Sequence, residues 1–149
     1  MVLLRVVPLA YLALCVGIAV LLHVLVPGTR VLAAPWNLLG VVPVALGVVV
    51  AGAAVVSLKR HGTTVKPLRK PKALVATGVF RLSRNPVYLG FVLVLLGAVA
   101  LLGSLTPWLI VPAFAVFTDA LFVRFEERRL EEVFGESWAE YKSRVRRWL

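Results

Sequence analysis

Long segments without charged residues dominate this sequence and limit what it can fold into. Residues 6–26 and 38–58 contain no Lys, Arg, Asp or Glu, and each reaches the roughly 20 residues that a helix needs to cross a bilayer. Residues 87–103 and 106–124 are shorter apolar segments around a turn with Gly and Pro, which predicts a tight helical hairpin, with a re-entrant hairpin as the alternative. Hydrophobic residues make up 60% of the chain, which is too apolar for an ordinary soluble globule. The sequence therefore predicts an all-α integral membrane protein with four transmembrane helices.

The cations are distributed unevenly between the loops. Residues 59–84 carry eight Lys or Arg and no acid, and seven more begin with Arg124, whereas the connection between the first two spans carries only Arg30. Lys and Arg in short loops beside spans stay in the cytoplasm. We therefore predict that the loop at residues 59–86, the tail at residues 125–149 and both chain termini are cytoplasmic, where the cations can meet membrane lipids.

The composition argues against several other classes of function. The net charge of +10 would suit nucleic acid, but the positive-inside effect explains the cations, and no basic face with interleaved aromatic residues accompanies them. Cys15 is the only cysteine, so no internal disulfide can form. His23 and His61 have no Cys, His or acidic cluster at ligand spacing, so we expect no metal site. We also expect no secretory signal, because the first apolar segment exceeds the usual roughly 7–15 residues.

Small and polar residues inside the apolar segments predict how the helices pack. Exposing the carboxylate of Asp119 to lipid would cost free energy, so this side chain should face protein or the cytoplasmic interface. Helical spacing places Asp119, Phe122 and Glu126 on one face. Three glycines of the second span would allow a neighbouring helix to approach closely, namely Gly40, Gly47 and Gly52.

The boundary between charge and apolar sequence at residues 84–90 is a candidate polar site at the membrane edge. Its sequence is Arg-Asn-Pro-Val-Tyr-Leu-Gly, and Pro86 suits the first turn of a helix, where free backbone N–H groups can meet an anionic ligand group. Glu126 and Glu127 lie just past the fourth span, where the positive-inside effect does not account for acids. These glutamates are therefore candidates for the same site.

The tail at residues 125–149 mixes aromatic and charged residues. It predicts an amphipathic helix broken near Gly135, for which anchorage at the membrane interface is the plainest role. The whole chain, residues 1–149, is predicted to form a single domain.

Several short motifs, taken in order and spacing, resemble one family of membrane enzymes. They are Gly-Thr-Thr-Val-Lys-Pro at residues 62–67, Ala-Leu-Val-Ala-Thr-Gly-Val-Phe at 73–80, Arg-Asn-Pro-Val-Tyr-Leu-Gly at 84–90, the pair Glu126 and Glu127, and Phe134-Gly135 with Tyr141. From residue 62 to residue 149 the chain is similar to the integral membrane methyltransferases related to isoprenylcysteine carboxyl methyltransferase, with the phospholipid N-methyltransferases as more distant relatives.

This resemblance implies an S-adenosylmethionine-dependent methyltransferase whose cofactor enters from the cytoplasm and whose lipid-like substrate arrives through the bilayer. The implied cofactor-binding residues are Lys72, Ala73, Leu74, Val75, Phe80, Asn85, Pro86, Val87, Tyr88 and Glu126. The implied catalytic residues are Arg124 and Glu127. The implied acceptor is the carboxylate of an isoprenylcysteine-like or other small hydrophobic molecule. A phospholipid amine, and a non-catalytic membrane module that retains the fold, are the alternatives.

Three positions depart from the family's usual pattern. Asn85 stands where histidine is commonest and Phe80 where tyrosine is, so the hydrogen bonds of those groups must change, although Asn can still donate and accept. Phe122 stands where some members carry a substrate-facing arginine, and Arg124 follows on a different helix face. Either Arg124 takes over that role by local distortion, or the acceptor is not a prenylcysteine carboxylate.

Overall fold

The computed structural model describes residues 7–63 and 71–149, and within these ranges the chain is helical and contains no β-strand. The α-helices are α1 (Val7–Leu25), α2 (Val41–Arg60), α3 (Pro86–Leu102), α4 (Ile110–Thr118) and α5 (Arg124–Arg144). Shorter elements join them, namely the 3-10 helices η2 (Trp36–Gly40), η3 (Gly78–Arg81) and η4 (Thr106–Leu109) and the π-helical turn η5 (Asp119–Val123). The predicted all-helical class is confirmed. The first residue of the predicted first span and residues 64–67 of the first motif lie outside the described residues.

Three helical stretches are long and apolar enough to cross a membrane, namely Pro8–Leu25, Trp36–Arg60 and Thr106–Arg144. The apolar helix α3 is shorter, and its 17 residues extend about 25 Å, against about 30 Å for the hydrocarbon core of a bilayer. The predicted fourth segment, residues 106–124, is only the first half of a helical stretch that continues to Arg144. The apolar helices indicate a membrane protein.

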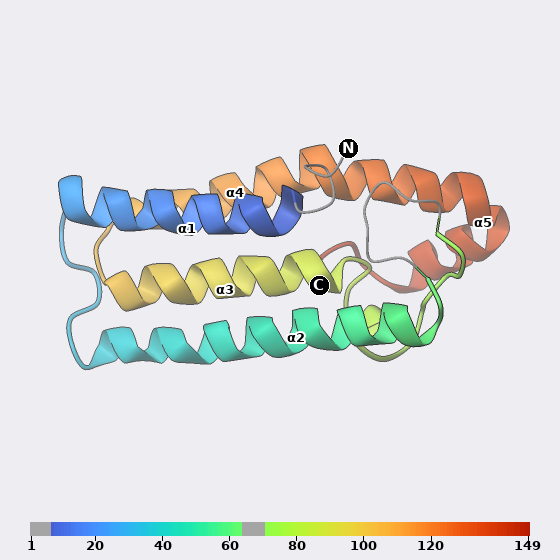
Figure 1. Cartoon of the computed structure of the whole chain (residues 1–149), viewed down its shortest axis with the longest axis horizontal. Helices are drawn as coiled ribbons and strands as arrows, with labels where there is room; N and C mark the ends of the chain where they lie inside the picture. Colours follow the sequence, from blue (N-terminus) through green and yellow to red (C-terminus); the bar gives the residue numbers. More distant parts are fainter. Residues whose placement is uncertain (1–6, 64–70) are drawn as a thin grey trace.

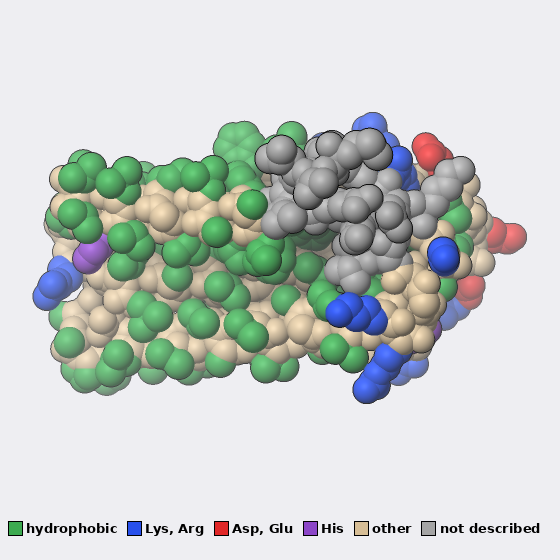
Figure 2. All heavy atoms as spheres, in the orientation of Figure 1, with side chains coloured by type: hydrophobic (Ala, Val, Ile, Leu, Met, Phe, Trp, Pro, Cys, Tyr) green, Lys and Arg blue, Asp and Glu red, His purple; other side chains and the backbone are tan. Residues whose placement is uncertain are grey.

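The helix α3 lies at the centre of the bundle and packs against α1, α2 and α4 (Figure 1). The connection from α1 to α2 and the turn from α3 to α4 lie together at one end of the bundle. The loop before α3, the helix α5 and the C-terminus lie at the opposite end. Most charged side chains visible in Figure 2 gather at this second end, whereas the sides of the bundle are apolar. We call this second end the polar end.

Glycines bring the backbones of α2 and α3 into direct contact. A Cβ atom added to Gly47 would lie 2.5 Å from the carbonyl oxygen of Gly90, and one added to Gly40 would lie 2.5 Å from that of Gly97. The close approach predicted for Gly40 and Gly47 is therefore confirmed. The prediction is wrong for Gly52, where an added Cβ would meet no described atom within 4 Å.

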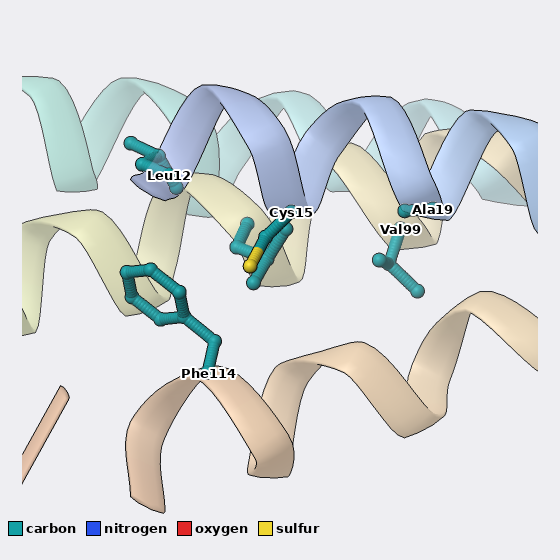
Figure 3. Packing of buried hydrophobic residues seen from close by; sticks show 6 residues of the cluster. Leu12, Cys15, Ala19, Val99 and Phe114 are labelled. Carbon is teal, nitrogen blue, oxygen red and sulfur yellow. The ribbon is translucent and has the colours of Figure 1, made fainter. Parts of the chain in front are cut away.

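A second layer of packing joins α1, α3 and α4 (Figure 3). Leu12, Cys15 and Ala19 recur at helical spacing and form one buried face of α1. This face packs with Val99 of α3 and Phe114 of α4, both of which are fully buried. The packing fixes α4, and therefore the start of α5, beside α3.

Hydrogen bonds fasten the loops at the end of the bundle opposite the polar end. The backbone N–H groups of Val31 and Leu32 donate to the carbonyl oxygen of Gly103 at 2.8 and 3.0 Å. Gly103 ends α3 with a φ of +76°, and a Cβ there would lie 2.3 Å from the carbonyl oxygen of Leu32, so only glycine fits. His23 Nδ1 lies 2.7 Å from Ser104 Oγ. The turn after α3 is thus held to the connection between α1 and α2.

Candidate functional site

Tyr88 and Glu126 meet at the polar end of the bundle. Tyr88 lies in the first turn of α3, which begins at Pro86 as the sequence predicts, and Glu126 is the third residue of α5. The hydroxyl of Tyr88 donates a hydrogen bond of 2.7 Å to Glu126 Oε1. Among the described residues, Tyr88 is the only hydrogen-bond donor to Glu126. The second carboxylate oxygen therefore remains able to accept a hydrogen bond from a ligand.

Aromatic rings connect this pair to the apolar core. Phe122 stacks on Tyr88 with ring centroids 6.2 Å apart and an interplanar angle of 16°, and Phe91 meets Tyr88 edge-on at 6.3 Å. Tyr11 of α1 packs against Phe122 at 6.5 Å and stacks on Phe114 at 5.2 Å. These rings give the Tyr88 side of the site an apolar, electron-rich surface.

Glu127, next to Glu126, is the centre of a buried ionic network. Its Oε1 accepts hydrogen bonds from Arg84 Nε at 3.1 Å and Asn85 Nδ2 at 3.2 Å, and lies 3.0 Å from Arg84 Nη2. Its Oε2 accepts from Arg147 Nη2 at 2.8 Å and Nε at 3.1 Å. The side chains of Glu127 and Arg84 are 7% and 8% exposed, so water does not screen their attraction. Removing Arg84 or Arg147 would leave this buried carboxylate with one charged partner fewer.

Arg84 also fastens the segment that follows α5. Its Nη1 donates to the carbonyl oxygens of Lys142 at 3.1 Å and Val145 at 3.0 Å. Its backbone N–H donates to the carbonyl oxygen of Arg146 at 3.0 Å. Its guanidinium carbon lies 5.7 Å from the ring centroid of Trp138, which is fully buried. The C-terminal segment is therefore held across the start of α3.

Asp119, the first residue of the π turn, binds two arginines. Its Oδ2 accepts from Arg124 Nε at 2.8 Å and its Oδ1 from Arg147 Nη1 at 3.3 Å. The prediction that Asp119 faces the same way as Glu126 is wrong, because Asp119 shares Arg147 with Glu127 instead. A π turn inserts one residue into the helix, which rotates everything after it by about 100° relative to regular α-helical spacing.

The two residues that the resemblance implies as catalytic take part in ion pairs. The side chain of Arg124 is 62% exposed and pairs with Asp119. Glu127 is buried and bound by Arg84 and Arg147. Neither residue is hydrogen-bonded to the Tyr88 hydroxyl, which bonds Glu126 instead.

The loop residues predicted to wrap a cofactor are held by Thr63 at the end of α2 and by packing against the tail. The backbone N–H groups of Lys72 and Ala73 approach Thr63 Oγ1 at 3.0 and 3.4 Å. Val75 and Phe80 are buried in one cluster, and Leu74 and Val87 pack against it. That cluster includes Tyr141 of α5, whose hydroxyl donates a hydrogen bond of 2.6 Å to the carbonyl oxygen of Phe80.

Asn85 is buried between α3 and the C-terminal segment. Its Nδ2 donates to Glu127 Oε1 at 3.2 Å and to the carbonyl oxygen of Arg147 at 3.4 Å. Its backbone N–H donates at 3.1 Å to Ser83 Oγ, which in turn donates at 3.0 Å to the same Arg147 carbonyl. Both amide N–H groups of the Asn85 side chain therefore serve this network.

The adjacent glutamates, which lie past the fourth apolar segment, differ in acidity. Burial raises the pKa of Glu126 to about 7, and the hydrogen bond from Tyr88 opposes this rise. Burial also acts to raise the pKa of Glu127, but the hydrogen bonds and charges of Arg147 and Arg84 outweigh it and hold that pKa below its ordinary value. Glu127 is therefore ionised at neutral pH, whereas Glu126 titrates near pH 7.

Sequence reasoning did not find Arg147. It lies 20 residues from Glu127, which is too far along the chain for any helical spacing to connect them. The tail also contains other cations that look the same in sequence, such as Lys142, Arg144 and Arg146. Only the path of the chain after α5 distinguishes Arg147 from them.

Comparison with known proteins places these residues in a family. A family model described as phospholipid methyltransferase matches residues 36–137, a range that includes Tyr88, Glu126 and Glu127. An uncharacterized protein of Haemophilus influenzae is 38% identical over 63 residues, which are 42% of this chain and all of that relative. No solved structure matches the chain. Because the family model covers well over half of its residues, this chain belongs to the phospholipid methyltransferase family.

Proposed function

We propose that this protein is an S-adenosylmethionine-dependent methyltransferase of the membrane that acts on a lipid-like acceptor. Membership of the phospholipid methyltransferase family supports methyl transfer to a lipid-type substrate. The hydrogen bond of 2.7 Å between Tyr88 and Glu126 is the observation that supports a ligand site at particular residues. It provides a carboxylate that can bind a ligand at the polar end of an otherwise apolar bundle.

The chemistry of this end suits the cofactor. Glu126 can accept hydrogen bonds from hydroxyl or amino groups. The backbone N–H groups of Val87 and Tyr88 lie in the first turn of α3, where a helix supplies no internal acceptor, so they can donate to a carboxylate. The rings of Tyr88 and Phe122 attract cationic groups. When bound, the cofactor supplies a methyl group that transfers by direct displacement to a lone pair of the acceptor.

The protein's main task in such a displacement is alignment. Glu126 and Tyr88 would hold the cofactor, together with the loop residues predicted from the resemblance. The resemblance implies that Glu127 and Arg124 are catalytic. Because both side chains are engaged in ion pairs, we propose that they position other groups. Glu127 would act by holding Arg84 and the start of α3, and Arg124 by holding the π turn.

The methyl acceptor could belong to either of two chemical classes, a carboxylate or a phospholipid amine. The resemblance favours the carboxylate of an isoprenylcysteine-like molecule, which needs no general base. The family description favours a phospholipid amine, and two features of this chain support it. Phe122 offers a ring face to a cation, and Arg124, which could bind a carboxylate, is paired with Asp119 at 2.8 Å.

For the membrane arrangement we propose four spanning segments, namely α1, α2, α3 and the helical stretch at residues 106–124, with the polar end and both termini in the cytoplasm. The gathering of cations near the polar end supports this orientation (Figure 2). The part of α5 around Gly135, whose φ of 48° breaks the helix as the sequence predicts, would be an amphipathic segment at the interface.

Calorimetric titration of the detergent-purified protein with S-adenosylhomocysteine tests the proposal. We expect saturable binding that Glu126→Gln weakens. An absence of binding at millimolar ligand would rule out both enzyme hypotheses and favour the non-catalytic module. Transfer of a radiolabelled methyl group to lipid extracts then identifies the acceptor class, since a carboxylate ester is labile to base and a methylated amine is stable.

A further inference from the structure

The guanidinium of Arg147 connects the helix on both sides of the π turn η5. It binds Glu127 Oε2 at 2.8 and 3.1 Å and Asp119 Oδ1 at 3.3 Å. Asp119 is the first residue of η5, and Glu127 lies about one helical turn past its end. Among the described residues, Arg147 is the only one that pairs with both of these acids.

The π turn brings Glu126 to the face of the helix that meets Tyr88, where a regular α-helix would present Phe125. In a regular α-helix, residues seven apart lie on the same face, so Asp119 would point the same way as Glu126. With one residue inserted, Glu127 takes that face, and Glu126 is turned away from it by about 100°. The contacts agree with this rotation, because Glu127 shares Arg147 with Asp119 while Glu126 bonds Tyr88.

We propose that Arg147 is a positioning residue that holds η5 in its π form and thereby directs Glu126 toward Tyr88. A π turn is rare and less regular than the α-helix around it, so it needs interactions that favour it. A planar guanidinium suits this role, since its several donors can bind two carboxylates at once. The inference rests on the proposed function, because it concerns the same cofactor site.

The contacts of the Arg147 side chain with Asp119 and Glu127 are not needed to attach the tail to the bundle. The C-terminal segment is already held by hydrogen bonds from Arg84 to the carbonyl oxygens of Lys142, Val145 and Arg146. Those bonds use backbone atoms of the segment and do not require the side chain of Arg147. The side chain is therefore available to act on η5.

The first test compares two arginine variants of the tail. Arg147→Ala should weaken binding of S-adenosylhomocysteine on the order of tenfold, because Glu126 would lose its orientation. Arg144→Ala is the matched control, since Arg144 is 70% exposed and, within the described part of the chain, pairs only with Glu140 on the same helix. The control should bind within about twofold of the wild type. Wild-type affinity in Arg147→Ala would overturn the inference.

The second test removes the need for Arg147. Deleting Ala120, which is exposed within η5, would convert the π turn to an α-helix without changing the faces of the helix on either side. Arg147 should then be dispensable, so the Ala120 deletion should restore the affinity of Arg147→Ala to within about threefold of the wild type. A folded double variant that stays on the order of tenfold weaker would overturn the role of the π turn.

Amide hydrogen exchange provides a readout that does not depend on ligand or on the deletion variant. Exchange across residues 119–127 should accelerate in Arg147→Ala and not in Arg144→Ala, because only the first loses the bridge over η5. Unchanged exchange in Arg147→Ala would overturn the inference. If the wild type binds no S-adenosylhomocysteine, the proposed function fails, whereas the exchange experiment still decides whether Arg147 holds the turn.

Discussion

The hydroxyl of Tyr88 lies 2.7 Å from the carboxylate of Glu126, although 38 residues separate them in the chain. The tight turn between α3 and α4 makes this possible, because α3 leads away from the polar end and α4 returns to it (Figure 1). The next residue, Glu127, points instead to Arg84 and Arg147. Adjacent glutamates thus have different surroundings, because Glu126 is bonded by a tyrosine hydroxyl and Glu127 by two arginines.

Removing either member of the Tyr88 and Glu126 pair should weaken cofactor binding and leave the fold intact. Hydrogen bonds to charged groups contribute about 1.5–3 kcal/mol, so Glu126→Gln should cost roughly tenfold or more in affinity for S-adenosylhomocysteine. Tyr88→Phe removes one hydrogen bond and should cost about fivefold. Calorimetry measures both. Tyr141→Phe is the control, because its hydroxyl bonds the Phe80 carbonyl and should affect stability more than binding. Unchanged affinity in both site variants would remove the proposed site.

Cofactor affinity should depend on pH through Glu126. Its pKa is raised to about 7, so below that pH the group is a neutral acid and above it a carboxylate that attracts cationic and hydrogen-bond-donating groups. Affinity should therefore rise as the pH increases through about 7. Titrations of the wild type and of Glu126→Gln at several pH values would check this. An equal pH dependence in both proteins would assign the effect to another group.

The buried pair of Arg84 and Glu127 should be important for stability. Arg84→Ala would leave the Glu127 carboxylate buried with one partner fewer, and breaking such pairs costs about 3–5 kcal/mol. Arg124→Ala, by contrast, removes an arginine that is 62% exposed and should cost about 0–1 kcal/mol. Unfolding in detergent micelles measures both. Equal losses in the two variants would contradict the central place of the Arg84 pair.

Acid should weaken the same network. The folded-state pKa of Glu127 is lowered, so its stabilisation is fully present above the pKa of the unfolded chain and is lost as the pH falls through the folded-state value. Unfolding of the wild type measured at decreasing pH should therefore show a loss of stability in the acid range. Glu127→Gln should be less stable at neutral pH and should show a smaller further loss on acidification.

The helix α2 contains one glycine that contacts α3, Gly47, and one that does not, Gly52, so the effects of substituting the two can be compared. Gly47→Ala would place a Cβ 2.5 Å from the Gly90 carbonyl oxygen, and overpacking of this kind costs about 1–3 kcal/mol. Gly52→Ala meets no described atom within 4 Å, and alanine favours helix more than glycine does, so this variant should be neutral or slightly more stable. Melting temperatures in detergent would measure the difference. Similar losses at both positions would show that helix contact is not the cause.

Local features of the fold could be predicted from the sequence because their causes are local. Hydrophobicity alone placed α1 and α2 close to their observed ends, and the fixed φ of Pro86 placed the start of α3. The break at Gly135 follows from a residue that tolerates a positive φ. The error at Gly52 has a related cause, because the sequence shows which residues are small but not which face of the helix meets a neighbour.

The sequence by itself determined the helices, their apolar surface, the charge boundary before Pro86 and the family, since each depends on composition or short-range pattern. Only the tertiary structure decided that the face of the helix that meets Tyr88 carries Glu126. A regular helical period assigns Glu126 and Asp119 to one face, and the π turn changes that assignment by one residue. Arg147, which binds Asp119 in the π turn, comes from near the end of the sequence. Contacts between residues so far apart in the sequence depend on the path of the folded backbone.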